Sequence, residues 1–476
     1  MFAKQPYIDG KLVDAGEVFE VINPATEAPV GTIVLANADA ALAALDAADK
    51  AFPMWANMPA SERVKWMHKL RDAVIEHEDH LRTCVHLEMG KPWAATKDDY
   101  DMLVDSLNFY ADEIMAIKGE ELKDKEGTHT HMLTREPIGV VAAFLAWNFP
   151  LLNLAYKLGP AMASGCPIII KPSMQTPLSA YAVGELCAKI GLPAGVVNII
   201  SGHNREIGDL ISASTIPAML TLIGSTQTGL HVMKAGSTSI KRYSMELGGN
   251  APVLVFADAD LDLAADTVVA LKYGNSGQIC VAPNRVFVAA EVAEAFTQKI
   301  VERAKATKVG FGKDQDIDMG PVIDEGSWKR IDGLVQDAIA NGATLLAGGG
   351  RPEGQDIGSF YAPTVLSNVT DDMRVCREEV FGPVINLMQF TDEADVLDIA
   401  NNTDAGLTAY IFTQDQDRAD SFAARLRFGE IQINGVKYAI NLPHCGIKQS
   451  GIGVDCSHLA LDEYLAPKRV SRAIIK

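Results

Sequence analysis

A cysteine, Cys280, lies in the stretch YGNSGQICVAPNR, residues 273–285. Small and polar residues precede it, and glycines there allow the backbone to approach a ligand closely. A thiol on such a loop can attack an electrophilic carbon when nearby donors or positive charge favour the thiolate. Free cysteine is also among the most buried residue types, so a structural thiol has similar weight for this stretch alone.

An amide and a carboxylate in two other motifs would complement such a nucleophile. Asn148 in AWNFP follows an apolar run, and its amide N–H can be donated to an oxyanion. Glu246 in MELGG has apolar neighbours, and a partly desolvated carboxylate there can act as a base near neutral pH. Taken singly, an asparagine turn before Pro150 and a surface glutamate are the commoner interpretations.

Three further motifs have the composition of a nucleotide-binding groove. Lys171 in KPS ends a strand-like run and can bind a ribose hydroxyl or a phosphate. IGSTQTG places Gly224 and Ser225 where a strand leads into a helix, and free N–H groups at a helix N-terminus suit a pyrophosphate. REEVFGPV contributes Glu379, an acceptor for sugar hydroxyls, and Phe381, which can pack on a flat ring. Each signal is weak in isolation, because a solvated lysine or a charged turn explains it equally well.

Alternating strand-like and helix-like segments must position these residues. Apolar runs that suit buried strands cover residues 138–145, 167–171, 196–200 and 218–224. Helical segments between them predict parallel pairing with crossover helices. An amphipathic stretch over 61–88 predicts one long helix with Ser61 as its N-cap, and Thr176 with Pro177 predicts the start of another. The pattern restarts after residue 250, so we predict two α/β domains with a boundary near 247–252.

The composition excludes several classes of protein. The formal net charge of −19 argues against nucleic acid as a partner, because phosphate repels an acidic surface. No apolar run is long enough to span a bilayer, and the N-terminus does not resemble a signal peptide. The seven cysteines are widely spaced and form no CxxC motif, which predicts no disulfide framework and no metal site. We therefore expect a cytoplasmic protein that does not bind membranes.

The order and spacing of the motifs resemble the NAD(P)-dependent aldehyde dehydrogenase superfamily over essentially the whole chain. The matching stretches are INPAT, AWNFP, KPS, GLPAGVVNIISG, GSTQTG, MELGG, GQIC, EEVFGPV and GIKQSGIG. The resemblance implies that Cys280 attacks an aldehyde, that Asn148 and the Cys280 backbone N–H hold the oxyanion, and that Glu246 activates water to hydrolyse the thioester. Members that transfer the acyl group to coenzyme A commonly lack this glutamate. With Lys171, these three residues form the predicted catalytic set.

The resemblance also implies a dinucleotide site. The expected cofactor-binding residues are Trp147, Lys171, Ser173, Met174, Gly224, Ser225, Glu379 and Phe381. Many members that prefer NAD carry a glutamate at the position of Met174, where it binds the adenosine ribose. Met174 neither repels a 2′-phosphate nor bonds the 2′-hydroxyl, and Ser173 and Lys171 can assist a phosphate. NAD is the first choice, and NADP or dual use remains open.

The residues expected to contact the substrate differ from those of the subgroup that the overall sequence resembles. Relatives that act on succinate semialdehyde bind its carboxylate with two arginines, and Tyr156 and Gly274 stand at those positions here. Without these cations an anionic tail would be desolvated with little compensation. We therefore predict an aromatic or apolar aldehyde, with a semialdehyde or hydroxyaldehyde of the succinate semialdehyde or lactaldehyde type as the alternative. The predicted pocket comprises Tyr156, Ile279, Val281 and His444, although His444 has a loop histidine as its simpler interpretation.

The expected architecture has a Rossmann-like cofactor domain, a second α/β catalytic domain and a small β extension for oligomerisation. The predicted limits are 1–117 and 138–247 for the first, 248–448 for the second, and 118–137 with 449–476 for the extension. The alternating tail KRVSRAIIK predicts a strand that needs a partner, so a homodimer or homotetramer is expected. A non-catalytic binding protein on the same fold is the alternative of another class.

Overall fold

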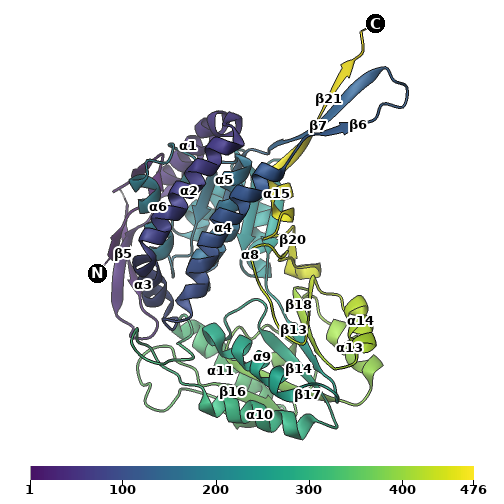
Figure 1. Ribbon diagram of the computed structural model, residues 1–476. Helices are drawn as coiled ribbons and strands as arrows, with labels where there is room; N and C mark the ends of the chain where they lie inside the picture. Colours follow the sequence, from purple (N-terminus) through teal and green to yellow (C-terminus); the bar gives the residue numbers. More distant parts are fainter. Residues whose placement is uncertain (1, 15, 476) are drawn as a thin grey trace.

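The computed structural model describes residues 2–14 and 16–475, which form two large sheets covered by helices (Figure 1). The first sheet has eight strands in the order β20-β12-β11-β8-β9-β10-β2-β3. Its strands are β8 (Val140–Phe144), β9 (Ile168–Lys171), β10 (Val197–Ile199), β11 (Pro217–Ile223), β12 (Arg242–Glu246), β2 (Tyr7–Ile8), β3 (Lys11–Leu12) and β20 (Gly451–Ile452). The strands from β12 to β10 pair in parallel, as predicted.

The second sheet repeats this architecture with seven strands in the order β15-β16-β17-β14-β13-β18-β19. Its strands are β13 (Ala251–Val255), β14 (Pro283–Ala289), β15 (Thr344–Ala347), β16 (Thr364–Ser367), β17 (Val384–Phe390), β18 (Thr408–Phe412) and β19 (Glu430–Ile433). All neighbours pair in parallel except β15 and β16. The sheet changes between β12 and β13, within the predicted boundary of 247–252.

Helices bury the apolar faces of both sheets, as expected for parallel sheets. Around the first sheet lie α1 (Ala38–Asn57), α2 (Ala60–Glu76), α3 (Glu78–Met89), α4 (Thr96–Ala116), α5 (Pro150–Ser164), α6 (Leu178–Lys189), α7 (Asp209–Ala213), α8 (Thr226–Gly236) and α15 (Leu459–Tyr464). Around the second lie α9 (Leu261–Tyr273), α10 (Ala293–Ala306), α11 (Glu325–Ala340), α12 (Arg374–Arg377), α13 (Glu393–Asn401) and α14 (Gln416–Arg425). Every residue of β8, β9 and β13 is buried. Among the described residues, no helix is long and apolar enough to cross a membrane.

A β extension projects from the body of the molecule, with the C-terminal end of the chain at its tip (Figure 1). It consists of β6 (Glu120–Leu122), β7 (His129–Pro137) and β21 (Leu465–Ala473), all antiparallel. The tail strand therefore finds its first partner, β7, in its own chain. Residues 451–452 lie in the first sheet as β20, whereas the prediction grouped 449–476 with the extension. A separate small sheet comprises β1 (Phe2–Lys4), β5 (Pro29–Val34) and β4 (Val18–Ile22).

Two helix starts differ from the predictions. The stretch 61–88 forms two helices, α2 and α3, because His77 between them has non-helical backbone angles. The first of these helices, α2, begins at Ala60 without a side-chain cap from Ser61. At α6 the predicted cap Thr176 donates its hydroxyl to the Trp147 carbonyl instead. The backbone N–H groups of Leu178 and Ser179 donate to the buried carboxylate of Glu88 at 2.5 and 3.1 Å. A carboxylate from α3 thus caps α6, and no local pattern predicts such a contact.

Candidate active site

A strained turn presents Cys280 between α9 and β14. Asn275 and Ser276 adopt left-handed backbone angles, with φ of 47° and 56°. Gly277 follows with φ of 71°, and a Cβ at this position would lie 2.2 Å from the Gly382 carbonyl oxygen. The Ser276 hydroxyl donates to the Gly320 carbonyl at 2.7 Å, which secures the turn. The loop therefore requires a glycine at position 277, and it leaves the Cys280 thiol half-buried.

The Asn148 amide is held in a fixed orientation beside this loop. Its Nδ2 donates to the Gln278 carbonyl at 3.1 Å, and its Oδ1 accepts from Asn153 Nδ2 at 3.2 Å. The Asn148 backbone carbonyl accepts from Asn275 Nδ2 at 2.9 Å. An amide nitrogen carries two hydrogens, so one remains for an oxyanion. No sequence motif pointed to Asn153, whose hydrogen bond sets the orientation of the Asn148 amide.

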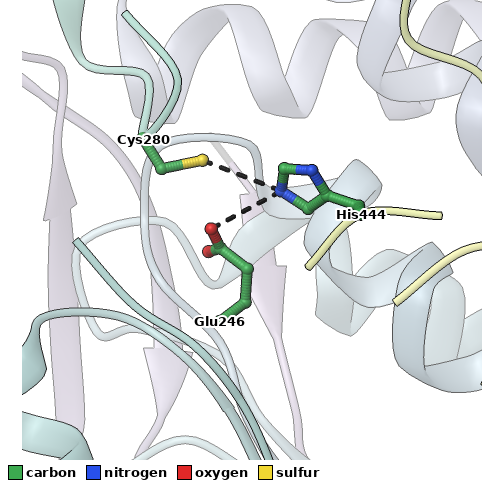
Figure 2. A group of neighbouring side chains, drawn as sticks. All are labelled: Glu246, Cys280 and His444. Atoms are coloured by element: carbon green, nitrogen blue, oxygen red, sulfur yellow. Dashed lines mark hydrogen bonds and ion pairs between the residues drawn. The ribbon is translucent and has the colours of Figure 1, made fainter. Parts of the chain in front are cut away.

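Cys280, Glu246 and His444 converge in one cluster (Figure 2). His444 Nε2 lies 4.0 Å from Cys280 Sγ and 3.5 Å from Glu246 Oε1, at the carboxyl end of β12. Burial raises the pKa of the Cys280 thiol to about 12, Glu246 adds to the rise, and the hydrogen bond with His444 opposes it. Among the described residues, Glu246 Oε1 is buried with no hydrogen-bond partner, and its contact with His444 is an ion pair at 3.5 Å. The cluster thus joins a thiol, a carboxylate and an imidazole in a largely buried place.

A cavity of about 290 Å³ contains three of the four predicted catalytic residues, and Lys171 lines a second one. Its lining includes Cys280, Glu246 and Asn148 together with Trp147, Gly224, Ser225, Glu379 and Phe381. A second cavity of about 650 Å³ is lined by Lys171, Ser173 and Met174, and it shares Trp147, Gly224 and Ser225 with the first. All eight residues predicted for the cofactor therefore lie along one continuous groove that ends at Cys280.

The residues predicted for the substrate pocket lie differently. The lining of the cavity at Cys280 includes none of Tyr156, Ile279, Val281 and His444. Tyr156 is buried beside His444, with 6.0 Å between the ring centroids. Val281 is buried, and its carbonyl accepts from the Tyr410 hydroxyl at 2.7 Å, whereas Ile279 is half-buried.

The groove has features that suit a dinucleotide. The α8 helix begins at its edge with Ser225 as N-cap, so the helix N-terminus can bind a phosphate. Burial lowers the pKa of Lys171 to about 8, and its Nζ donates to Asn204 Oδ1 at 2.6 Å. Burial raises the pKa of Glu379 to about 7, and this carboxylate accepts from the Gly249 N–H at 3.1 Å. These buried groups can bond ribose hydroxyls and phosphates, so the residues fit the cofactor.

Comparison with known proteins agrees with this geometry. A sequence model described as the Aldehyde dehydrogenase family matches residues 12–470. The chain belongs to the aldehyde dehydrogenase family. It is 36% identical over 471 residues to the succinate-semialdehyde dehydrogenase (NADP+) GabD of Escherichia coli, covering 98% of this chain and 97% of that protein.

Solved structures of other aldehyde dehydrogenases have the same fold. An NADP-dependent enzyme of Escherichia coli superposes with a TM-score of 0.97 at 36% identity, covering 99% of this chain and 98% of that one. Betaine aldehyde dehydrogenase of Staphylococcus aureus, solved with NAD+, superposes with a TM-score of 0.96 at 33% identity, covering 99% and 95%. This aldehyde dehydrogenase is thus an NAD(P)-linked enzyme, and the alternative of a non-catalytic protein is not supported. Arg205, which the sequence analysis missed, lines the same part of the groove as Met174.

Proposed function

We propose that the enzyme oxidises an aldehyde to its carboxylic acid with Cys280 as the nucleophile and Glu246 as the base for hydrolysis. One observation carries this proposal: Cys280, Glu246 and Asn148 line one cavity of a groove that fits a dinucleotide. Bound NAD(P) would supply the hydride acceptor, held by Lys171 and Glu379 on its sugars.

The reaction requires three tasks of the protein. The Cys280 thiolate forms a bond to the aldehyde carbon, and the carbonyl electron pair moves to the oxygen. The free N–H of Asn148 and the Cys280 backbone N–H stabilise this oxyanion. After the carbon loses its hydride, the thioester remains, and Glu246 removes a proton from the water that attacks it. The thiolate leaves, and the acid is released.

A Cys280→Ala variant tests the nucleophile directly. We expect NAD(P)H formation from an aldehyde to disappear, while the variant still binds the dinucleotide. Cys445→Ala is the matched control, because Cys445 is also a half-buried free thiol but its Sγ is not part of the cluster. Undiminished turnover by Cys280→Ala would remove Cys280 from the mechanism.

We propose an aldehyde with an uncharged aromatic or apolar tail as the substrate. His444 lies outside the lining of the cavity, but its Nε2 is 4.0 Å from Cys280 Sγ, so its surroundings support this choice. Tyr156 and Tyr438 lie beside its ring, and the charged groups in contact with it are the carboxylates of Glu246 and Glu430. Two carboxylates disfavour an anionic tail at this place. The relatives favour a second candidate, because the Escherichia coli protein named above acts on succinate semialdehyde.

An aldehyde panel separates the two candidates. We expect kcat/KM for benzaldehyde and medium-chain aldehydes to exceed that for succinate semialdehyde, with either NAD or NADP. A clear preference for succinate semialdehyde would assign the enzyme to the semialdehyde group and overturn our interpretation of Tyr156. Lactaldehyde in the same panel tests the hydroxyaldehyde alternative.

The setting of the enzyme is also a proposal. All seven cysteines are free thiols, which supports a reducing compartment such as the cytoplasm. The projecting extension exposes apolar side chains, including Met132 and Val470, which supports a homodimer or homotetramer.

A further inference from the structure

His444 is the member of the cluster that the reaction described above leaves without a task. Its backbone N–H and carbonyl both pair with Asp455 at 2.8 Å, and Asp455 in turn accepts from Lys157 Nζ at 2.6 Å. The side chain is 9% exposed. The backbone of this loop residue is therefore fixed, and its imidazole is nearly buried.

The two ring nitrogens of His444 face different partners. Nδ1 lies 2.6 Å from Glu430 Oε1, whereas Nε2 faces both Glu246 Oε1 at 3.5 Å and Cys280 Sγ at 4.0 Å (Figure 2). When Nδ1–H donates its hydrogen bond to a carboxylate, Nε2 is the ring nitrogen that can take up a second proton. Glu430 is itself nearly buried and accepts from the Thr408 hydroxyl at 3.4 Å. Carboxylate, imidazole and thiol thus follow one another in the order that activates nucleophiles in unrelated enzymes.

The surroundings of Cys280 create the need for such a partner. Glu246 is the nearest carboxylate, and burial together with this negative charge opposes formation of the thiolate. Burial lowers the pKa of His444, but contacts with Cys280, Glu246 and Glu430 outweigh burial and raise this pKa well above its ordinary value. An imidazolium at this place would offset both carboxylates and stabilise the sulfur anion.

We propose that His444 is a catalytic residue that holds the proton given up by Cys280, and that Glu430 is its positioning residue. This inference rests on the proposed role of Cys280. The S–H bond breaks, an N–H bond forms at Nε2, and the freed electron pair on sulfur forms the bond to the aldehyde carbon. When the thioester is hydrolysed, the departing thiolate meets the imidazolium again, while the proton of the attacking water goes to Glu246.

The separation of 4.0 Å is consistent with this role in an enzyme without substrate. Catalytic hydrogen bonds are often long before the substrate binds, and they shorten in the reacting complex. The rings of Tyr156 and Tyr438 lie 6.0 and 6.1 Å from the His444 ring, centroid to centroid, and limit its movement. The titratable groups around the ring are Cys280, Glu246, Glu430, Tyr156, Tyr438, Cys445, Asp455 and Cys456.

The pH dependence of Cys280 alkylation tests the proposal without any turnover. Iodoacetamide labelling of the full-length enzyme is followed by mass spectrometry of the Cys280 peptide from pH 5 to 10. A Cys445→Ser background removes the neighbouring thiol, and EDTA keeps trace metal ions from reacting with thiols. Burial and Glu246 alone would keep the Cys280 thiol protonated at neutral pH. The proposed transfer of its proton to His444 therefore predicts that labelling of the parent enzyme reaches its plateau near neutral pH.

His444 and Glu430 together form the proposed proton relay of Cys280. Replacing either residue should move the pH profile of Cys280 labelling toward alkaline pH. In His444→Phe we expect the inflection to rise, with the rate at pH 7 falling about tenfold for each unit of the shift. Glu430→Gln keeps the shape of the side chain and should shift the profile in the same direction by less. Tyr438→Phe is the matched control, because it changes a ring beside His444 and leaves the imidazole and both carboxylates; its profile should match the parent.

Superimposable profiles for the parent, His444→Phe and Glu430→Gln would overturn the proposal. If His444→Phe fails to fold, Glu430→Gln alone decides, since the relay predicts a shift that a purely structural histidine does not. The result is also separable from the proposed function. An enzyme that oxidises aldehydes but shows unshifted labelling refutes only the relay, whereas shifted labelling without aldehyde oxidation refutes only the function.

Discussion

Glu246 and Cys280 act at different stages of the proposed reaction, so their loss should have different kinetic signatures. A Glu246→Gln variant removes the base but keeps the size of the side chain. We expect one equivalent of NAD(P)H per active site in a rapid burst, followed by turnover reduced on the order of 10²-fold or more. Stopped-flow absorbance at 340 nm separates the two phases. Loss of the burst itself would show that Glu246 acts before hydride transfer instead.

If Lys171 binds the cofactor as proposed, cofactor binding should depend on pH. Its pKa is lowered to about 8 by burial, so its side chain is cationic below that pH and neutral above it. A neutral amine binds a dinucleotide less well, so the dissociation constant should rise between pH 7 and pH 9. Glu379, whose pKa is raised to about 7 by burial, becomes charged over the lower part of this range and acts in the opposite direction.

A Lys171→Arg variant isolates the contribution of the lysine, because a guanidinium stays charged throughout. Calorimetric titration with dinucleotide should give an affinity that no longer falls above pH 8. A variant that keeps the alkaline decline of the wild type would assign that decline to another group.

At the scale of the element, the turn before Cys280 depends on one glycine. Gly277→Ala would place a side chain at φ of 71° and within 2.2 Å of the Gly382 carbonyl oxygen. Left-handed strain alone costs about 1–3 kcal/mol, and the clash forces the turn to move. We expect a lower midpoint of urea unfolding and slower alkylation of Cys280.

Gly333→Ala is the matched control for this substitution. Gly333 is exposed within α11, and a Cβ there would meet no atom within 4 Å. Alanine in a helix interior is favoured over glycine by about 0.5–1 kcal/mol, so this variant should unfold at a higher urea concentration. Equal effects of the two substitutions would show that the turn tolerates a side chain at position 277.

Elements with strong local patterns could be predicted from the sequence, and contacts between distant elements could not. The buried runs at β8, β9, β10 and β11 were predicted as parallel strands, because continuous apolar sequence is typical of strands covered on both faces. The break at His77 was missed, since the amphipathic period continues through it. The cap of α6 by Glu88 was missed because the two lie about ninety residues apart in sequence.

The same distinction holds within the candidate site. Cys280, Glu246 and Asn148 stand in motifs whose order along the chain is distinctive, and the structure brings them to one cavity. Asn153 and Glu430 have no local signature, because each matters only through a contact formed in three dimensions. His444 was noted in the sequence, but its place beside Cys280 depends on the backbone pairing with Asp455.

At the scale of the whole molecule, the site is assembled from both large sheets and from the returning chain. Glu246 ends β12 in the first sheet, and Cys280 precedes β14 in the second. The chain returns through His444 to β20, which pairs with β12. Movement of one sheet relative to the other would therefore separate the base from the nucleophile.

The projecting extension exposes apolar side chains on both of its long strands, and the proposed assembly should depend on it. Met132 of β7 lies opposite Val470 of β21, and the two side chains are 42% and 45% exposed. A Met132→Glu/Val470→Lys double variant adds a charge to each strand while the opposite charges preserve the cross-strand pair. We expect light scattering after size exclusion to show monomers in place of the dimer or tetramer proposed for the wild type. Leu42→Glu/Ile75→Lys makes the same charge change at exposed apolar positions on α1 and α2 and should keep the wild-type mass. If the extension variant keeps the wild-type mass, the new charges do not prevent assembly. The subunit interface would then lie on another surface, and the charged pair would stay exposed to solvent in the oligomer.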